Sequence, residues 1–189
     1  EAQFLNSVAQ SDSSDLFLTA TAYINKVLKV SSAVQYNPDE STTNRATLRT
    51  RYSPRPGKLI DVSYRLIRNL TNSDDDIKQI NLAGQWPLGG GWSSIGRYNY
   101  DIKKSGAVEA LGGFEYDGGC WASRIVVNKL SLATTEKPNY TLFMQIELGG
   151  LGSLGASNDT NLFDVLDRNV PGATFSSKIP DQYRKENLN

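Results

Sequence analysis

Hydrophobic and polar residues alternate with a period of two along most of this chain, which is the pattern of β-strands with two different faces. Within Lys58–Arg68, for example, Ile60 and Val62 fall on one face, while Ser63 and Arg65 fall on the other. Turn residues such as glycine, proline and aspartate separate nine segments of this kind. The nine predicted strands are Asp15–Tyr23, Val27–Tyr36, Thr43–Tyr52, Lys58–Arg68, Ile77–Trp86, Gly91–Ile102, Gly106–Tyr116, Cys120–Leu130 and Asn139–Leu148. The chain is therefore predicted to be all-β and antiparallel.

The length of these strands favours a transmembrane β-barrel over a soluble β-sandwich. Each spans about 9–12 residues, whereas strands of globular proteins average about 5–6. About 9–11 tilted residues cross a bilayer, with apolar side chains towards lipid and polar side chains towards the lumen. Aromatic residues near the strand ends fit the interfacial girdles of such barrels: Tyr23, Tyr36, Tyr52, Trp86, Trp92, Tyr116, Trp121 and Tyr140. A soluble sandwich binding module is the alternative, because its outer face also alternates.

Composition removes several classes of function. The chain has 189 residues, 20 basic and 20 acidic residues, no histidine and one cysteine. Without histidine, a serine–histidine–aspartate triad is excluded and the commonest zinc ligand is missing. A net charge of zero gives no reason to expect a nucleic-acid partner. We therefore expect a protein that is not an enzyme and that binds no metal, cofactor or nucleic acid.

The strand number and the polar end of the chain predict a piece of a larger barrel. Bacterial single-chain barrels normally have an even number of strands, and about forty mostly polar residues follow the ninth strand here. We predict the end of an extracellular loop at 1–14, the C-terminal strands of an outer-membrane β-barrel at 15–149, and a periplasmic C-terminal tail at 150–189. The links set this orientation, because such barrels place short turns on the periplasmic side. Short links at 24–26, 53–57, 87–90 and 117–119 alternate with longer ones at 37–41, 69–76 and 131–138, and 103–105 is a short exception.

Cys120 follows a Gly-Gly turn at the predicted periplasmic rim. One interpretation is a small buried thiol. The other is a disulfide to a cysteine outside this chain, which the oxidising periplasm favours.

Six arginines fall on the polar strand faces and are predicted to face the lumen. They are Arg45, Arg49, Arg51, Arg65, Arg97 and Arg124. One interpretation is charge balance in a water-filled lumen, with Asp61, Asp101, Glu109 and Glu115 as counterparts. The other is a lumen that guides an anionic amphiphile or holds a plug protein.

Three C-terminal segments carry a resemblance to a known family. Gly113–Arg124 combines an aromatic-rich strand with a tight turn, a cysteine and an Ala-x-Arg sequence, and Phe143–Leu151 ends in Ile-Glu-Leu-Gly-Gly-Leu. Asn161–Gly172 ends in a proline-containing turn. These segments resemble the C-terminal region of the lipopolysaccharide-assembly outer-membrane proteins, the LptD family. Some relatives carry two adjacent cysteines where this chain has Gly119 and Cys120, so the resemblance implies one disulfide at this turn.

The resemblance implies a function in lipopolysaccharide (LPS) transport. Family members insert LPS into the outer leaflet of the Gram-negative outer membrane through a lateral opening between the first and last barrel strands. It also implies three partners: LPS, the plug lipoprotein LptE and a periplasmic bridge protein. Another outer-membrane barrel, a diffusion pore or a nutrient receptor, is the main alternative.

The last predicted strand would then form one edge of the lateral gate. Alternation assigns Tyr140, Leu142, Met144, Ile146 and Leu148 to lipid, and Thr141, Phe143, Gln145 and Glu147 to the lumen. Glu147 would repel phosphate unless a cation intervenes. An ordinary closed seam, fully hydrogen-bonded, is the alternative.

Overall fold

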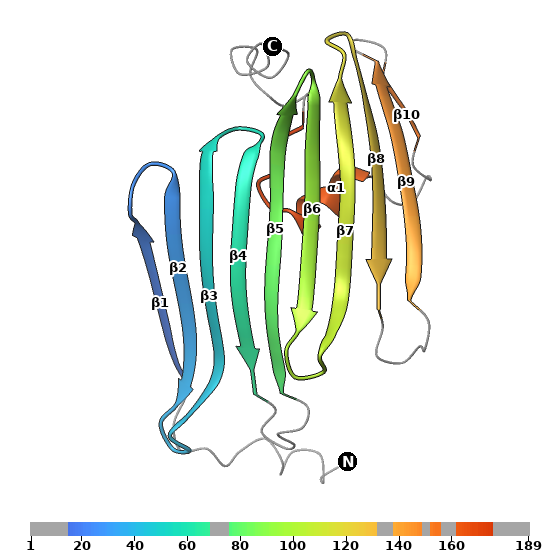
Figure 1. The fold of residues 1–189 in the computed structure, drawn as a ribbon. Helices are drawn as coiled ribbons and strands as arrows, with labels where there is room; N and C mark the ends of the chain where they lie inside the picture. The colour runs from blue at the N-terminus through green and yellow to red at the C-terminus, as the bar shows by residue number, and fades with distance from the viewer. Residues whose placement is uncertain (1–14, 69–75, 132–137, 149–151, 156–161, 176–189) are drawn as a thin grey trace, which may run out of the picture.

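The computed structural model describes residues 15–68, 76–131, 138–148, 152–155 and 162–175. These residues form one antiparallel sheet of ten strands in sequential order, together with one helix (Figure 1). The all-β prediction is therefore confirmed, and the described residues contain no second sheet of the kind a sandwich needs. The strands are β1 (Leu16–Tyr23), β2 (Leu28–Asn37), β3 (Thr42–Arg55), β4 (Lys58–Ile67), β5 (Ile77–Gly89), β6 (Trp92–Asp101), β7 (Gly106–Asp117), β8 (Trp121–Leu130), β9 (Asn139–Leu148) and β10 (Gly152–Gly155). The helix is α1 (Leu162–Asn169).

Nine of the ten strands lie where the alternation predicts them, and β10 is an addition. β10 pairs antiparallel with the end of β9, from Gly152 opposite Leu148 to Gly155 opposite Gln145. The expected loop end at 1–14 and the predicted boundary at 149/150 lie outside the described residues.

Asparagine and aspartate side chains stabilise the links between strands. The Asn25 side-chain oxygen accepts hydrogen bonds from the backbone N–H groups of Val27 and Leu28, at 2.9 and 2.8 Å. Asp101 accepts from two backbone N–H groups of the next link in the same way. Such local bonds satisfy backbone groups that leave the strand ladder. The Asp101 carboxylate therefore caps the turn that follows β6.

The links at the two ends of the sheet differ in length. At the upper end of Figure 1 the strands are joined through 24–27, 56–57, 90–91 and 118–120, and at the lower end through 38–41, 68–76, 102–105 and 131–138. Both two-residue links contain glycine with positive φ, at Gly57 and at Gly90 and Gly91, which only glycine adopts readily.

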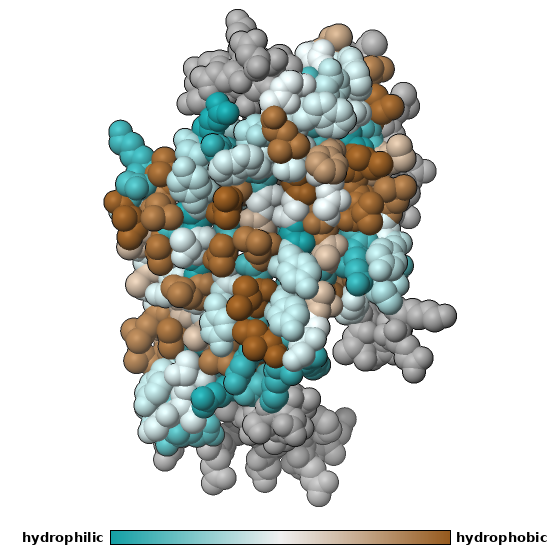
Figure 2. Space-filling model, in the orientation of Figure 1, coloured by the Kyte–Doolittle hydropathy of each residue, from teal (hydrophilic) through white to brown (hydrophobic). Residues whose placement is uncertain are grey.

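The sheet has two faces of different character. We call the face on which α1 packs the inner face and the opposite one the outer face (Figure 1). Exposed aliphatic and aromatic side chains cover the outer face, and Figure 2 shows them spread across its middle. Near the short links, Trp92, Tyr116 and Trp121 form a row of ring contacts with centroids 5.0 and 5.2 Å apart. The one described helix is not long and apolar enough to cross a membrane.

Candidate functional site

The inner face carries ion pairs between neighbouring strands. Arg49 and Arg51 of β3 both bond to the Asp61 carboxylate of β4, through their Nε atoms at 2.8 and 2.9 Å. The Asp61 side chain is 1% exposed, so it requires these partners. The register explains the geometry, because Asp61 stands directly opposite Arg51 and two positions from Arg49 along the same face.

Arg124 of β8 connects three strands across the inner face. Its Nε donates to Glu115 of β7, and one of its terminal nitrogens donates to Glu147 of β9 at 2.9 Å. The Arg124 side chain is 1% exposed, and its guanidinium carbon lies 5.4 Å from the ring centroid of Phe175. The negative charge of Glu147 is therefore balanced by Arg124 within the sheet itself. This arginine is the kind of cation that would prevent Glu147 from repelling a phosphate group.

Residues 162–175 lie on the inner face. We call residues 162–175 the C-terminal segment; it contains α1 and the stretch from Val170 to Phe175. An apolar cluster joins it to β4–β8 and consists of Leu59, Ala83, Ile95, Leu111 and Val126 on the sheet and Leu162, Val165, Leu166, Val170, Ala173 and Phe175 on the segment. In this area the inner face is apolar, and its side chains hold the helix on the sheet.

Polar contacts fix the C-terminal segment in register with the sheet. The Gln85 amide forms two hydrogen bonds with the backbone of Thr174, at 2.8 and 2.9 Å. Arg51 donates to the Pro171 carbonyl at 2.8 Å, and Arg97 donates to the Asn169 side chain at 2.6 Å. Because these contacts reach β3, β5 and β6, they specify one position of the segment on the inner face.

A small polar pocket lies between the end of α1 and strands β3–β6. Its volume is about 190 Å³. Four arginines line it, Arg49, Arg65, Arg97 and Arg168, together with polar side chains that include Asn81 and Asn99. Arg97 is held by the Asn81 side chain at 2.7 Å and lies 3.4 Å from Glu109. Such a surface suits an anionic or strongly hydrogen-bonding group.

The six predicted arginines do not form one site. Arg49, Arg51, Arg97 and Arg124 belong to the network beneath or beside the C-terminal segment. Arg45 and Arg65 are exposed, and no ion pair joins either of them to another described residue. Sequence reasoning did not identify Gln85, Asn169 or Arg168 as members of the site, because their contacts depend on where the C-terminal segment packs.

Cys120 lies away from this network, whereas β9 contributes Glu147 to it and has one partly open side. Cys120 is exposed in the link 118–120 at the end of the sheet that carries the short links. β9 has β8 on one side, and β10 covers only its Gln145–Leu148 end on the other. Within the described part of the chain, Asn139–Met144 is therefore an unpaired sheet edge.

A one-sided apolar sheet with long antiparallel strands and a charged inner face is the architecture of a segment of a membrane β-barrel. Comparison with known proteins also indicates an outer-membrane protein family. A family model described as "LptD: LPS transport system D" matches residues 1–92. The LPS-assembly protein LptD of Thiobacillus denitrificans is 36% identical over 168 residues, which cover 89% of this chain and 22% of the relative.

Two further relatives are also named LPS-assembly protein LptD. The protein of Chromobacterium violaceum is 38% identical over 166 residues, covering 86% of this chain and 21% of the relative. The protein of Azoarcus sp. strain BH72 is 36% identical over 151 residues, covering 79% of this chain and 18% of the relative. The chain belongs to the LptD family, and it spans about a fifth of the length of these relatives.

Proposed function

We propose that this chain is the C-terminal strand region of an outer-membrane translocon that inserts LPS into the outer leaflet. The relatives are named LPS-assembly proteins, and the two faces of the sheet suit the two halves of that amphiphile. The apolar outer face would contact the hydrocarbon of the membrane. The arginines and amides around the 190 Å³ pocket would line the route of sugar and phosphate groups. No step of this process needs a catalytic residue in the chain.

The observation that carries the proposal is the partly unpaired edge of β9. An exposed sheet edge in lipid leaves backbone N–H and C=O groups unsatisfied, so a second strand must complete it in the resting state. β10 occupies this position only beside Gln145–Leu148. We infer that the first strand of the barrel pairs with Asn139–Met144 and separates there during transport, while β10 keeps the other end covered.

A disulfide lock tests this gate. Thr141→Cys would be combined with a cysteine opposite it on the first strand of the intact protein, and the pair would be oxidised. The gate proposal predicts that the locked protein no longer delivers LPS to the cell surface and that reduction restores delivery.

A matched control uses the other side of the same strand. Thr141 stands opposite Asn128 of β8, so Thr141→Cys with Asn128→Cys locks two strands that are already paired. This control should transport normally. Normal LPS delivery with the first-strand lock in place would disprove the lateral opening at this edge.

We also propose that Cys120 forms a disulfide with a cysteine outside this chain. It is the one cysteine of the sequence and is exposed at a rim of the sheet, where a preceding domain can reach it. In the chain-entropy model, closing so long a loop adds roughly 4–5 kcal/mol. Full-length protein should migrate differently with and without reductant. Free alkylation of Cys120 in the native protein would refute the bond.

The remaining partners follow from the same proposal. LptE would occupy the part of the lumen that the C-terminal segment leaves open, and a periplasmic bridge protein would deliver LPS at the end with the short links. Exposed Arg45 and Arg65 are two inner-face arginines that could meet either ligand or plug.

A further inference from the structure

The polar pocket beside the end of α1 has a floor on the sheet and a roof on the C-terminal segment. Its floor consists of two neighbouring cross-strand rows of the inner face. One row runs from Arg49 of β3 to Asn99 of β6, and the next contains Arg65 of β4. Arg168 and Asn169 of α1 belong to the roof. Because residues far apart in the sequence meet here, the pocket exists only when the C-terminal segment is packed on the sheet.

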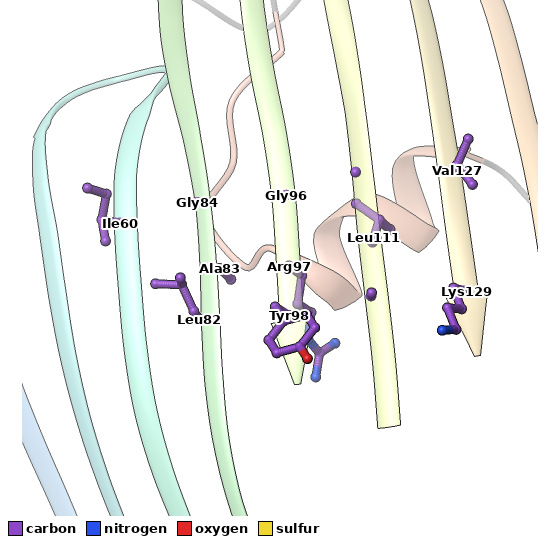
Figure 3. Close-up of a pocket in the computed structure, with 12 residues that line it drawn as sticks. Ile60, Leu82, Ala83, Gly84, Gly96, Arg97, Tyr98, Leu111, Val127 and Lys129 are labelled. Carbon is purple, nitrogen blue, oxygen red and sulfur yellow. The ribbon is translucent and has the colours of Figure 1, made fainter. Parts of the chain in front are cut away.

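The lining of the pocket carries an excess of positive charge. Among the described residues, four arginines and no carboxylate line it. Arg49 and Arg97 have carboxylate partners on neighbouring strands, and Arg97 also reaches Asn169 at the end of α1 (Figure 3). Arg65 and Arg168 form no ion pair with any other described residue. These two guanidinium groups are therefore available for an anion, which an arginine binds through two parallel hydrogen bonds.

A buried amide oxygen in the same pocket lacks a partner. Asn99 is 9% exposed, and its side-chain oxygen forms no hydrogen bond with any described residue. A buried oxygen of this kind requires a hydrogen-bond donor. A water molecule can satisfy the oxygen, but it does not balance the charge of two arginines. A single ligand that has both an anionic group and a hydroxyl group meets both requirements.

These two requirements separate the classes of ligand. A carboxylate side chain of another protein offers acceptors alone and leaves the Asn99 oxygen without a donor. A phosphorylated sugar offers phosphate oxygens to the arginines and ring hydroxyls to the amide oxygen. The pocket volume of about 190 Å³ equals that of roughly six waters at about 30 Å³ each, which is room for one sugar ring.

We propose that this pocket binds one phosphorylated sugar unit, with its phosphate at Arg65 and Arg168 and a hydroxyl group at Asn99. The inference rests on the proposed function, because LPS is the source of that unit. It adds a defined binding site, built partly by the C-terminal segment, to the route of the saccharide.

The position of the pocket fits this route. Gln79 of β5 lines the pocket, and it lies nearer to the link 68–76 than Gln85, which bonds to Thr174 of the C-terminal segment. The pocket is therefore on the side of the segment that faces the longer links, which the sequence predicts to be extracellular. A saccharide would reach it after passing the C-terminal segment.

The test measures binding to the intact full-length protein, purified in mild detergent with any lipoprotein that accompanies it. Glucose 6-phosphate is the probe, and inorganic phosphate and glucose are titrated separately. Phosphorus-31 NMR gives the dissociation constants of the two phosphates, and saturation-transfer NMR gives that of glucose. The wild type should bind glucose 6-phosphate at least about fivefold more tightly than either control compound, because only the probe satisfies both Asn99 and the arginines.

Two kinds of variant separate recognition of the charge from recognition of the hydroxyl group. Arg65→Gln and Arg168→Gln should each weaken binding of glucose 6-phosphate and of inorganic phosphate about tenfold, because each loses a charge-assisted hydrogen bond. Asn99→Leu should weaken glucose 6-phosphate about fivefold and leave inorganic phosphate unchanged. It should also preserve the thermal stability of the ligand-free protein, because it removes a buried oxygen that has no partner there.

Matched controls lie on the same face outside the pocket. Arg45→Gln removes an exposed arginine, and Asn128→Leu removes another buried amide oxygen that has no described partner. Neither residue lines the pocket, so both variants should bind glucose 6-phosphate like the wild type. Heat-modifiable gel migration checks that every variant is folded.

Three outcomes would overturn the proposal. The first is equal binding of glucose 6-phosphate and inorganic phosphate by the wild type. The second is folded Arg65→Gln and Arg168→Gln proteins that bind the probe like the wild type. The third is release of a co-purifying lipoprotein by these variants while probe binding stays constant, which would assign the pocket to a side chain of that lipoprotein. If Asn99→Leu does not fold, Asn99→Ala replaces it, and an unchanged preference for the probe would count equally against the proposal.

This result is independent of the lateral gate, because probe binding is measured without transport. A protein that binds the probe but delivers LPS normally with the first-strand lock would disprove the gate alone. A protein whose lock blocks delivery but whose pocket does not bind the probe would disprove the pocket alone.

Discussion

Arginines in two parts of the inner face differ in burial and in ion pairing. Under the C-terminal segment, Arg124 is 1% exposed and pairs with Glu115 and Glu147. Arg45 and Arg65 are not covered by the segment; both are exposed, Arg65 at the polar pocket beside the end of α1, and neither forms an ion pair with another described residue. Both parts show the same period-two alternation. Coverage by the segment, and not the alternation, therefore decides which arginines stabilise the protein and which can meet a ligand.

Removing an arginine from each part should show the largest difference. Arg124→Leu removes the guanidinium from the buried ion pair with Glu115, and breaking a buried ion pair by removing one partner costs about 3–5 kcal/mol. Arg65→Leu should change the free energy of unfolding by no more than about 0.5 kcal/mol. Urea unfolding of the full-length protein in detergent measures both, and equal midpoints for the two variants would contradict the comparison.

The apolar cluster beneath α1 should be nearly as sensitive. Leu166 is 1% exposed, so Leu166→Ala removes buried side-chain atoms and leaves a cavity, at a cost of about 2–5 kcal/mol. Arg168 lies exposed on the same helix, and Arg168→Ala should cost about 0.5 kcal/mol or less. Protease cleavage of the C-terminal segment provides a second measurement, which should accelerate for Leu166→Ala alone.

Adjacent residues of β4 test the two faces of the sheet. Val62 is 44% exposed on the outer face, and arginine there should cost about 2–4 kcal/mol if that face meets lipid near the bilayer midplane. Ser63 lines the polar pocket, where Ser63→Arg keeps its charge in an aqueous setting. The folding yield into membranes should fall for Val62→Arg only. Equal losses would show that the faces are assigned wrongly.

Two glutamines of β5 give the smallest contrast. Gln85→Ala leaves the N–H and C=O groups of Thr174 without their side-chain partner, and each unsatisfied buried group costs about 1–3 kcal/mol. Gln79→Ala, on the same face but at the open pocket, should have little effect. Thermal unfolding measures the stability of both variants. If Gln79→Ala is as destabilised as Gln85→Ala, the contact with Thr174 does not contribute more to stability than the pocket glutamine does.

The strands could be predicted because each follows a simple local rule. Period-two alternation located β1–β9, with ends that differ by a few residues where β3 and β5 continue towards their turns. β5 runs past Pro87, where a register shift accommodates a residue that cannot donate to the ladder. β10 is only four residues long and contains two glycines, so pairing with β9 rather than its own sequence makes it a strand.

The helix of the C-terminal segment was not predicted, although two local signals were present. Leu162, Val165 and Leu166 have the spacing of one helix face, and Pro171-Gly172 follows the helix, with Gly172 at a φ of 87°. Apolar residues on the polar faces of the strands, such as Val126 between Ile125 and Val127, also indicated that something covers that face. The partner of each contact could not be predicted, because the sequence does not specify where the helix packs.

Photo-crosslinking from Phe175 tests most directly whether the C-terminal segment lies on the inner face. Phe175 is 1% exposed and lies over Arg124, so p-benzoylphenylalanine at this position in the full-length protein should crosslink to peptides of β7 and β8 in the same chain. The same group at exposed Ile24 serves as the control and should not reach them. Crosslinks from position 175 only to other proteins, or to no part of β7 and β8, would contradict the account.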